Sequence, residues 1–499
     1  MSTTTTLPLY RQLAAHYRGA IEAGSLQPGA RLPSLRSLMQ LHDVSLSTAL
    51  QLCRTLESDG WAEARERSGY FVRRPQRLGM APMDEPDADV QPDPAQYVGI
   101  HSRVSDFVAR RRAADVKLNL SIARAAPQFY PADALRAAMT RALRLHPELV
   151  AGVPPLRGDP QFRAVLAKRA VAAGMVLSPD EVLVTNGCIE ALNLALRAVA
   201  QPGDTIAVES PTFYGLLQVL ESLGLRALEI PTSPQTGLSI EALELAARTY
   251  GDIKAVVVVP HLQMPQGSVM PDAHKERLVA LCVEHGLALI EDDIYREFVE
   301  SSQPMRPAKA WDRPGDAGQV IYCASLSKSF APGLRQGWMS AGRWNARVQM
   351  IKFARTRNMQ TWSQLLAART VGSPAYERHL RRMRASLKEQ REQSARAVAR
   401  YFPAGTRLSL PPGGISLWLE LPAGLSSSQL YDDALARGIR VAPGPMFSNT
   451  GRYERFLRLS CGMPFTPAVE EGYRVLGELL AAQCSALPKG RDGGRRAAA

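Results

Sequence analysis

Apolar residues recur at helical spacing three times near the start of the chain. Ser34 and Ser45 stand immediately before two of these stretches, and Gly24 follows the first. Serine is favoured just before a helix and glycine just after one. The residues 61–74 that follow have the length and turn content of a two-stranded hairpin. The pattern therefore predicts three short helices and a hairpin, with the helices over residues 7–23, 35–42 and 46–60.

The pattern changes between Leu118 and Leu487, where short apolar runs alternate with stretches of helical periodicity. Many of the runs are rich in β-branched residues, and turn residues or helices bound them. They predict buried strands over residues 181–185, 205–209, 254–260, 287–292 and 320–325. Strands that alternate with helices form a parallel sheet with crossover helices, so this region is predicted to be α/β.

A different composition separates these two regions. Residues 75–105 contain the stretch PMDEPDADVQPDP, which is rich in Pro and Asp and has little to bury, as is typical of a linker. The end of the chain is rich in Gly, Ala and Arg, which predicts a disordered basic tail. The predicted organisation is a head at 1–76, a linker at 77–112, a large domain at 113–487 and a tail at 488–499.

Length and charge support more than one domain. A chain of 499 residues is too long for one compact core. The net charge of +13 is weak evidence by itself, but in residues 1–77 arginines outnumber acidic residues ten to six. We find no apolar run long enough to cross a bilayer, and no secretory signal pattern at the start. The six cysteines lie far apart, so we expect reduced thiols in a cytoplasmic protein.

Three short helices followed by a hairpin wing form a winged helix-turn-helix, whose third helix enters the major groove of DNA. The segments PLYRQL, LQPGARLPSLRSL and VSLSTALQLCRTLESDG resemble the DNA-binding head of GntR-type regulators. The resemblance implies that double-stranded DNA is a partner and that Arg36 contacts its backbone or a base edge. It also implies the start of the recognition helix at Ser45, Ser47 and Thr48, and the tip of the wing at Ser68, Gly69 and Tyr70.

The head departs from that family at one position. GntR-type regulators usually have Ser-Arg where this chain has Ser45-Leu46. Leucine cannot make a bidentate contact to guanine, although it can contact a thymine methyl group, so the preferred DNA sequence is expected to differ. The alternative interpretation is a helical dimerisation or docking domain whose arginines are merely solvated. The GntR-like core favours DNA binding.

The segment SLSKSFAPGLRQGW, residues 325–338, places a lysine between small hydroxyl residues and follows it with a Pro-Gly turn and an arginine. Upstream, the acidic cluster EDDIY ends a predicted strand. Pyridoxal 5'-phosphate (PLP) needs a lysine for its Schiff base and a carboxylate for its pyridine nitrogen. Its phosphate needs hydroxyl and guanidinium donors. We expect Lys328 to form the Schiff base, Asp292 to face the pyridine nitrogen, and Ser325 and Arg335 to bind the phosphate.

Other segments supply the remaining contacts. In VLVTNGCIEALNL a strand, a tight turn and a helix follow one another, so the N–H groups of Gly187 and Cys188 can face a phosphate. Phe213 can stack on the cofactor ring, and Tyr295 can reach its phenolic oxygen. Arg458 can hold the carboxylate of an amino-acid ligand. Each residue alone has an ordinary structural explanation, but their order along the chain favours a PLP site.

Residues 118–485 resemble the fold type I aminotransferases of the aspartate aminotransferase group. The resemblance implies a mainly parallel sheet with helices on both faces and a smaller C-terminal α/β subdomain. A GntR-like head joined to such a domain resembles the MocR family of PLP-dependent transcriptional regulators. It implies a homodimer, because fold type I sites are built at a subunit interface.

Two residues differ from the aminotransferase pattern. Met264 stands in HLQMPQG, where these proteins usually have an asparagine that hydrogen-bonds the phenolic oxygen of PLP. A thioether is only a weak acceptor, so we expect a looser cofactor, with Gln263 or Gln266 as substitute donors. Val153 stands near the place of a tyrosine that commonly reaches the phosphate of the neighbouring subunit.

The favoured function is a cytoplasmic regulator that senses PLP or an amino-containing metabolite and changes how two winged heads bind DNA. A working aminotransferase that carries a DNA-binding head is an alternative, because the residues for proton transfer by Lys328 are present. A scaffold that binds DNA without PLP is a third. The effector, the operator and the sign of regulation do not follow from the sequence.

Overall fold

The structure, a computed structural model, describes residues 8–65, 68–73, 79–86, 91–113, 115–301 and 305–487. The predicted basic tail lies outside the described residues. The chain folds as two compact units. The first comprises Met1–Gly79 with Glu300–Pro304, and the second Met80–Val299 with Met305–Ala499.

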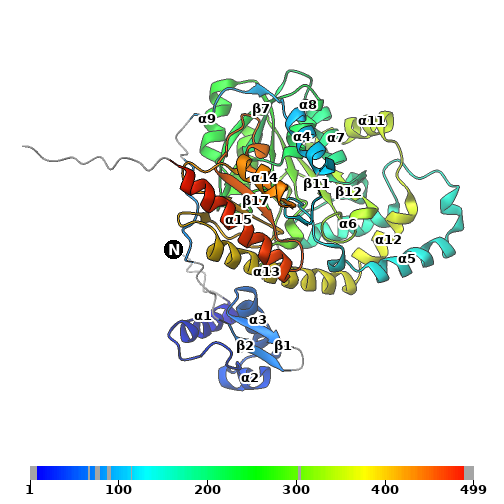
Figure 1. The fold of residues 1–499 in the computed structure, drawn as a ribbon. Helices are drawn as coiled ribbons and strands as arrows, with labels where there is room; N and C mark the ends of the chain where they lie inside the picture. Colours follow the sequence, from blue (N-terminus) through cyan, green and yellow to red (C-terminus); the bar gives the residue numbers. More distant parts are fainter. Residues whose placement is uncertain are drawn as a thin grey trace, which may run out of the picture. The chain divides into compact units, whose positions relative to one another are not determined.

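The first unit is three helices and a two-stranded wing (Figure 1). Its elements are α1 (Leu9–Glu22), α2 (Leu35–His42), α3 (Leu46–Ser58), β1 (Ala62–Arg65) and β2 (Gly69–Val72). The wing strands pair antiparallel, with Ala62 opposite Val72. Apolar residues from all three helices and both strands form one core, among them Ile21, Leu38, Leu52, Ala62 and Val72. The predicted helices and hairpin are confirmed.

Serine hydroxyls begin two of these helices. Ser34 accepts a hydrogen bond from the Ser37 amide at 3.1 Å, and Ser45 accepts one from the Thr48 amide at 3.2 Å. Such a cap satisfies one of the amides that the first turn leaves without a partner, and it typically stabilises a helix by about 1 kcal/mol. The chain direction at the start of α3 is therefore set by Ser45.

The second unit is built on a nine-stranded sheet. The strands follow the order β3-β7-β6-β9-β10-β11-β12-β5, with β8 paired to β7. Their bounds are β3 (Gln96–Tyr97), β5 (Leu183–Asn186), β6 (Thr205–Ser210), β7 (Arg226–Ser233), β8 (Gly237–Leu238), β9 (Ile253–Val258), β10 (Ala288–Asp292), β11 (Val320–Ser325) and β12 (Gln336–Ser340). Strands β7, β6, β9, β10 and β11 pair in parallel, and β12 runs antiparallel to both of its neighbours.

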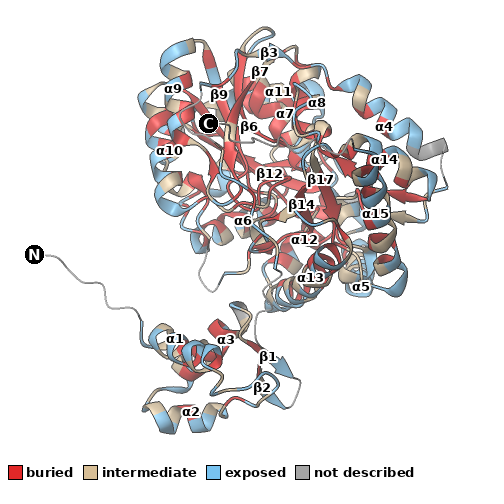
Figure 2. Ribbon diagram, turned by 60° about the vertical axis from the view of Figure 1, so that its left-hand side comes forward, coloured by how far each residue is buried: buried red, intermediate tan, exposed pale blue. Residues whose placement is uncertain are grey.

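Helices cover this sheet on both faces. Every residue of β6, β10 and β11 is buried, as expected for strands that helices cover on both sides, and Figure 2 shows β6 among the red strands of the sheet. The helices of this part are α4 (His101–Ala113), α5 (Ala132–Leu145), α6 (Pro160–Ala172), α7 (Cys188–Val199), α8 (Tyr214–Ser222), α9 (Ile240–Tyr250), α10 (Asp272–Glu284), α11 (Asn345–Arg355) and α12 (Thr361–Val371).

A smaller α/β subdomain completes the unit. It has an antiparallel sheet of order β13-β14-β17-β16, and helices α13 and α15 pack against each other (Figure 1). Its elements are α13 (Pro374–Tyr401), β13 (Arg407–Leu408), β14 (Ser416–Glu420), α14 (Ser427–Ala436), β15 (Ile439–Arg440), β16 (Ala442–Pro443), β17 (Phe456–Ser460) and α15 (Pro467–Ala486). Strand β4 (Leu118–Asn119) pairs in parallel with β15, so a segment from the start of the second unit lies beside this subdomain.

The five predicted strands are confirmed, with ends that differ by at most two residues. The sequence pattern missed β7 because Glu229 and Pro231 interrupt its apolar run. Glu229 is nevertheless buried, and it accepts hydrogen bonds from the Ser448 hydroxyl at 2.9 Å and the Asn449 amide at 2.6 Å. Partners distant in sequence therefore make a carboxylate acceptable inside this strand.

The predicted linker at 77–112 differs from the structure in its second half. Strand β3 joins the edge of the large sheet at β7, and α4 lies on the second unit. Arg103 of α4 donates to the carbonyl oxygens of Pro445 and Asn449 at 2.7 and 2.9 Å. Ile100 and Val104 are buried. The Pro- and Asp-rich composition ends before these apolar residues begin, so the linker prediction extended too far.

Within the described residues, no helix combines the length and apolar character that a membrane span requires. All six cysteines are free thiols.

Candidate functional site

A cavity of about 390 Å³ lies where strands β10 and β11 end. These strands are parallel neighbours, so their carboxyl ends meet at one edge of the sheet. Asp292 is the last residue of β10, and Lys328 follows the end of β11 by three residues. The residues that line the cavity are Arg124, Cys188, Ile189, Phe213, Val259, Met264, Asp292, Ile294, Tyr295, Ser327, Lys328, Pro332 and Arg335.

The Lys328 amine is held in position by the backbone. Its Nζ donates to the carbonyl oxygen of Ala123 and lies 5.7 Å from the ring centre of Tyr295. Burial, followed by the positive charge of Arg458, lowers the pKa of Lys328 to about 8. About one tenth of this amine is therefore neutral at pH 7, far more than of an ordinary lysine, and a neutral amine is the form that attacks a carbonyl carbon.

Asp292 faces the same cavity with one free oxygen. Its Oδ1 accepts hydrogen bonds from the Cys188 thiol at 3.0 Å and the Ile294 amide at 3.3 Å. Oδ2 makes no hydrogen bond to any residue that the structure describes. Burial raises the pKa of Asp292 to about 6, which the two hydrogen bonds partly oppose. A cationic N–H donor in the cavity would stabilise this carboxylate.

The N–H group of Cys188 was predicted to face a phosphate. Its side chain also belongs to the site, because the thiol contacts Asp292. The thiol is buried against Asp292, and burial and that carboxylate raise the pKa of Cys188 well above its usual value. The thiol therefore stays protonated and donates.

Arg335 and the start of helix α7 form a positive corner of the cavity. Arg335 Nη2 donates to the carbonyl oxygen of Asn186 at 3.3 Å. Gly187 precedes α7 with φ +77°, a backbone region that favours glycine, and a Cβ atom there would lie 2.7 Å from Arg335 Nη2. The absence of a side chain at Gly187 thus lets the guanidinium approach the helix N-terminus, where amide groups favour an anion.

The prediction for Ser325 needs a correction. Its hydroxyl donates to the carbonyl oxygen of Gln336 at 2.9 Å and lies 2.9 Å from the hydroxyl of Ser327. The Ser325 side chain does not line the cavity among the described residues, whereas Ser327 does. Because β11 is paired with β12 on this side, the backbone of the neighbouring strand takes up the Ser325 hydroxyl. Ser327 is the better candidate for an anion contact.

Two aromatic residues lie on the wall of the cavity as the sequence predicted. Phe213 precedes α8, and Tyr295 follows the acidic cluster. Tyr295 is buried, and burial raises its pKa, so its hydroxyl stays a donor. Tyr130, which the sequence reasoning did not single out, donates from its hydroxyl to the carbonyl oxygen of Lys328 at 3.0 Å.

Arg458 lies behind the cavity wall. It is buried, and its Nη1 lies 3.6 Å from the sulfur of Met264, which is also 3.8 Å from the Ser416 hydroxyl. Its Nη2 donates to the carbonyl oxygen of Ser121. The Met264 side chain lines the cavity and the Arg458 side chain does not, so the thioether separates this guanidinium from the cavity. Val153, which stands near the place of the usual tyrosine, is 88% exposed.

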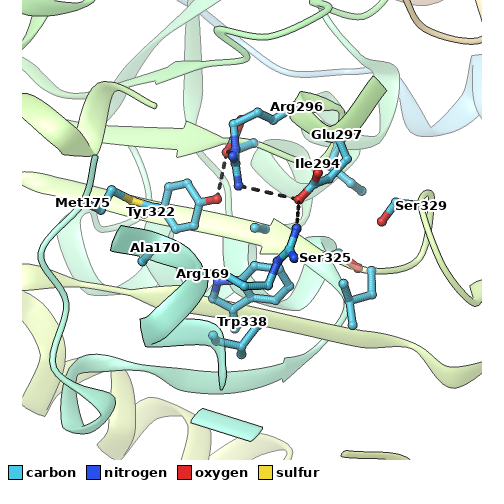
Figure 3. Close-up of a pocket in the computed structure, with 14 residues that line it drawn as sticks. Arg169, Ala170, Met175, Ile294, Arg296, Glu297, Tyr322, Ser325, Ser329 and Trp338 are labelled. Carbon is cyan, nitrogen blue, oxygen red and sulfur yellow. Dashed lines mark hydrogen bonds and ion pairs between the residues drawn. The ribbon is translucent and has the colours of Figure 1, made fainter. Parts of the chain in front are cut away.

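A buried charge network supports the other side of these strands (Figure 3). Side chains alternate along a strand, so Asp293 points away from the cavity that Asp292 faces. Asp293 Oδ2 lies 2.7 Å from Arg296 Nε and accepts the Tyr322 hydroxyl at 2.7 Å. Burial opposes its ionisation, but Arg296 and His261 hold the pKa of Asp293 below its usual range. The small cavity beside this network has about 20 Å³, which is room for little more than a water molecule.

The same side holds a group with metal-ligand atoms, since single atoms of His261, Glu291 and Asp293 lie within 4.8 Å of one another. These atoms already have partners. His261 Nδ1 lies 2.6 Å from Asp293 Oδ1, and its Nε2 lies 3.0 Å from the Lys275 amine. Glu291 accepts two backbone amides at 2.7 and 2.9 Å. The arrangement is that of a hydrogen-bonded core network.

In the head, the predicted DNA-contacting residues lie on three elements. Arg36 is exposed on α2. The hydroxyl of Ser45 lies 2.7 and 2.9 Å from those of Ser47 and Thr48 at the start of α3. Ser68, Gly69 and Tyr70 lie at the turn of the wing and the start of β2.

The structure also describes Leu46 and Arg31 of the head. Leu46, the residue in place of the usual arginine, is 55% exposed. Arg31 packs beside the wing: a Cβ atom at Gly69 would lie 3.5 Å from its guanidinium nitrogens. The sequence signal for Arg31 was only its place in the GARLPS turn.

The residues around the cavity at the ends of β10 and β11 fit PLP. A buried carboxylate with a free oxygen, an amine with a lowered pKa and a guanidinium at a helix N-terminus match its pyridine nitrogen, its aldehyde and its phosphate. Arg124, Ser327 and the carbonyl of Ala123 also belong to this site, and sequence reasoning missed them.

Comparisons with known proteins agree with both units. The aminotransferase class I and II model matches residues 117–467, and the model of bacterial regulatory proteins of the gntR family matches residues 9–72. The chain is 36% identical to the uncharacterized HTH-type transcriptional regulator YdcR of Escherichia coli (strain K12), over 94% of this chain and 98% of that protein. It is 24% identical to the probable rhizopine catabolism regulatory protein MocR of Rhizobium meliloti, over 88% and 86% of the two chains.

A solved structure gives the same fold for the large domain. The α-aminoadipate aminotransferase LysN of Thermus thermophilus, complexed with N-(5'-phosphopyridoxyl)-L-leucine, has a TM-score of 0.70 and 26% identity, and covers 78% of this chain and 97% of its own. Through this domain, of fold type I, and its GntR-type head, the chain belongs to the MocR-type GntR family of transcriptional regulators, whose members carry an aminotransferase class I and II domain.

Proposed function

We propose that this regulator binds PLP on Lys328 and that an amino-containing ligand at the same cavity, or PLP itself, changes its affinity for DNA. The observation that carries the proposal is the pairing of Lys328 with Asp292, whose Oδ2 has no partner among the described residues, across one cavity. This pairing occurs in a chain with a DNA-binding type of head. Mixing the purified full-length protein with PLP and recording its visible absorbance is the first test.

PLP, when bound, supplies an electron-withdrawing ring and an aldehyde that reacts with amines. The residues of this chain would hold it in a defined orientation. Asp292 would accept the pyridine N–H, and Arg335 with the first amides of α7 would bind the phosphate. Phe213 would stack on the ring, and Tyr295 would donate to the phenolic oxygen.

The ligand is proposed to be an amino acid or a similar amine. The relatives support this class: one is named an aromatic-amino-acid aminotransferase of Thermococcus litoralis, another a 2-aminoadipate transaminase of Thermus thermophilus. Arg458 would bind the α-carboxylate once Met264 moves aside, because it is buried, contacts the sulfur of Met264 and acts electrostatically on Lys328. Ligand binding would thus require a local rearrangement, which would supply the signal.

The DNA-binding unit is proposed to be a homodimer in the cytoplasm. Two heads on one dimer would match two half-sites. The start of α3, at Ser45, Ser47 and Thr48, would enter the major groove, and Arg36 and the wing would contact the flanking backbone.

Arg36→Ala tests the DNA part of the proposal. Loss of one phosphate contact should make the slope of log K against log salt shallower by about 0.9 and weaken binding at fixed salt. Fluorescence anisotropy with DNA from the chain's own promoter region measures both. Arg18→Ala, an exposed arginine of α1 that pairs with Glu22, is the matched control and should change neither. Equal affinity and slope for Arg36→Ala and the unmodified protein would remove Arg36 from the interface.

Met264→Asn tests the site's departure from the aminotransferase pattern. An amide can donate to the phenolic oxygen of PLP and a thioether cannot, so the dissociation constant for PLP should fall by about fivefold, the effect of one hydrogen bond. Met264→Leu keeps the apolar volume without the donor and should leave PLP affinity within about twofold. The prediction is wrong if Met264→Asn binds PLP no more tightly than Met264→Leu, as measured by absorbance titration.

A working aminotransferase remains the second candidate function, favoured by one observation: the lowered pKa of Lys328 suits an amine that accepts and returns a proton. Continuous release of 2-oxo acid from an amino acid, with a second 2-oxo acid supplied as acceptor, would support it. Conversion that stops after one equivalent would support the regulator.

A further inference from the structure

Arg124 brings a second guanidinium to the cavity. It follows Ala123, whose carbonyl oxygen accepts the hydrogen bond from Lys328, so the two cationic side chains belong to the same part of the wall. Arg124 also borders a neighbouring cavity of about 440 Å³, lined mainly by apolar side chains such as Leu135, Met139 and Leu334. Arg124 therefore borders both the proposed PLP cavity and this second cavity.

The Arg124 side chain is exposed, and it makes no hydrogen bond or ion pair with any residue in the described part of the chain. Its charge is felt in the cavity, because it contributes to the lowered pKa of Lys328 and opposes the rise in the pKa of Tyr130. The other two arginines differ from it, since Arg335 donates to Asn186 and Arg458 to Ser121.

When each charged residue of the site is paired with a charged group of the cofactor or ligand, Arg124 has no anionic partner. With PLP bound, Asp292 would balance the pyridine nitrogen, and Arg335 together with the positive N-terminus of α7 would balance the phosphate. The α-carboxylate of an amino-acid ligand would then balance Arg458. Arg124 would remain as an uncompensated positive charge beside the ligand's side chain, and an unpaired cation at the mouth of a low-dielectric cavity favours an additional anion.

We propose that the effector is an amino acid with a second acidic group, and that Arg124 binds that group. This proposal rests on the proposed function, because it assumes PLP on Lys328 and the α-carboxylate on Arg458. Arg124 would be a specificity-determining residue: it distinguishes a dicarboxylic ligand from a monocarboxylic one of the same size. The alternative effector is an amino acid with a large apolar side chain, which would enter the neighbouring cavity and make no contact with the guanidinium.

Ligands without an α-hydrogen test this by binding alone, because no proton can be removed from their α-carbon. The full-length protein, loaded with PLP, is titrated with 2-methylaspartate and 2-methylglutamate, and with their monocarboxylic counterparts isovaline and 2-methylnorvaline. The readouts are the change in visible absorbance and the shift in melting temperature. At least one diacid should bind about tenfold more tightly than its counterpart. Arg124→Gln should reduce this ratio to about one, and Arg124→Lys should retain part of it.

Arg136→Gln is the matched control. Arg136 borders the neighbouring cavity too, but it is exposed and pairs with Asp133, so its replacement should leave the ratio unchanged. A ratio that persists in Arg124→Gln would overturn the proposal. So would a loss of PLP affinity in that variant with the ratio intact, which would assign Arg124 to the phosphate. Tighter binding of 2-methylphenylalanine than of either diacid would favour the apolar cavity instead. If the unmodified protein fails to load PLP, the proposed function itself is contradicted.

Discussion

Replacing Lys328 with alanine should abolish the visible absorbance that PLP gives with the unmodified protein. No covalent link can form without this amine, so borohydride reduction should trap PLP on the Lys328 peptide of the unmodified protein and on no peptide of the variant. Mass spectrometry of the digested protein measures the outcome. Lys254→Ala, which removes an exposed lysine from β9, is the control and should be trapped like the unmodified protein.

The pH dependence of this reaction follows from the state of the amine. With a pKa of about 8, roughly one tenth of Lys328 is neutral at pH 7, so the rate of PLP capture should rise with pH and level off above about pH 8. The pKa of Lys328 is lowered in the folded protein, so protonating this amine destabilises the apo-protein. The free energy of unfolding of the apo-protein should therefore increase as the pH rises from about 8 toward the ordinary pKa of lysine. PLP trapped at another lysine in Lys328→Ala would contradict the assignment.

Asp292→Asn should weaken PLP binding by about ten- to a hundredfold. The carboxylate would make a charge-assisted hydrogen bond with the protonated pyridine nitrogen, and a neutral amide replaces it with a weaker contact. Absorbance titration at pH 7.5 measures the dissociation constant. Asp180→Asn, in an exposed side chain, is the control and should bind PLP normally.

The same residue should confer a pH dependence. Burial raises the pKa of Asp292 to about 6 from an ordinary value of 3.8, so its carboxylate destabilises the apo-protein. The protonated form of Asp292 is favoured by folding, so its stabilising contribution to the free energy of unfolding is fully present below about pH 4 and is lost as the pH rises through about 6. PLP affinity should increase over the same range as the carboxylate ionises. Both dependences should be weaker in Asp292→Asn, and a variant that keeps the full pH dependence would exclude Asp292 as the titrating group.

The positions of Asp292 and Lys328 could be predicted because they depend on chain order alone. Apolar runs marked β10 and β11, and parallel neighbouring strands end at the same edge of a sheet. The helices of the head could be predicted equally well, since capping serines and a glycine stop mark them. These features are local or follow from topology.

What the sequence did not predict depends on packing between distant segments. The Ser325 hydroxyl is taken up by the backbone of Gln336, and no local pattern indicates that. Arg458 lies against Met264 and does not line the cavity, whereas Arg124, from a segment far from Asp292 and Lys328 in the sequence, does line it. Periodicity places residues on a face of an element, but it does not say which side chain of another element lies opposite.

We propose that PLP on Lys328 controls DNA binding. The direct measurement is the dissociation constant for promoter DNA, by fluorescence anisotropy at fixed salt, with and without saturating PLP, for the unmodified protein and for Lys328→Ala. PLP should change this constant by about fivefold or more in the unmodified protein, in either direction, and should leave it unchanged in the variant. An unchanged constant in unmodified protein whose absorbance shows bound PLP would contradict this role of PLP, as would an equal change in both proteins.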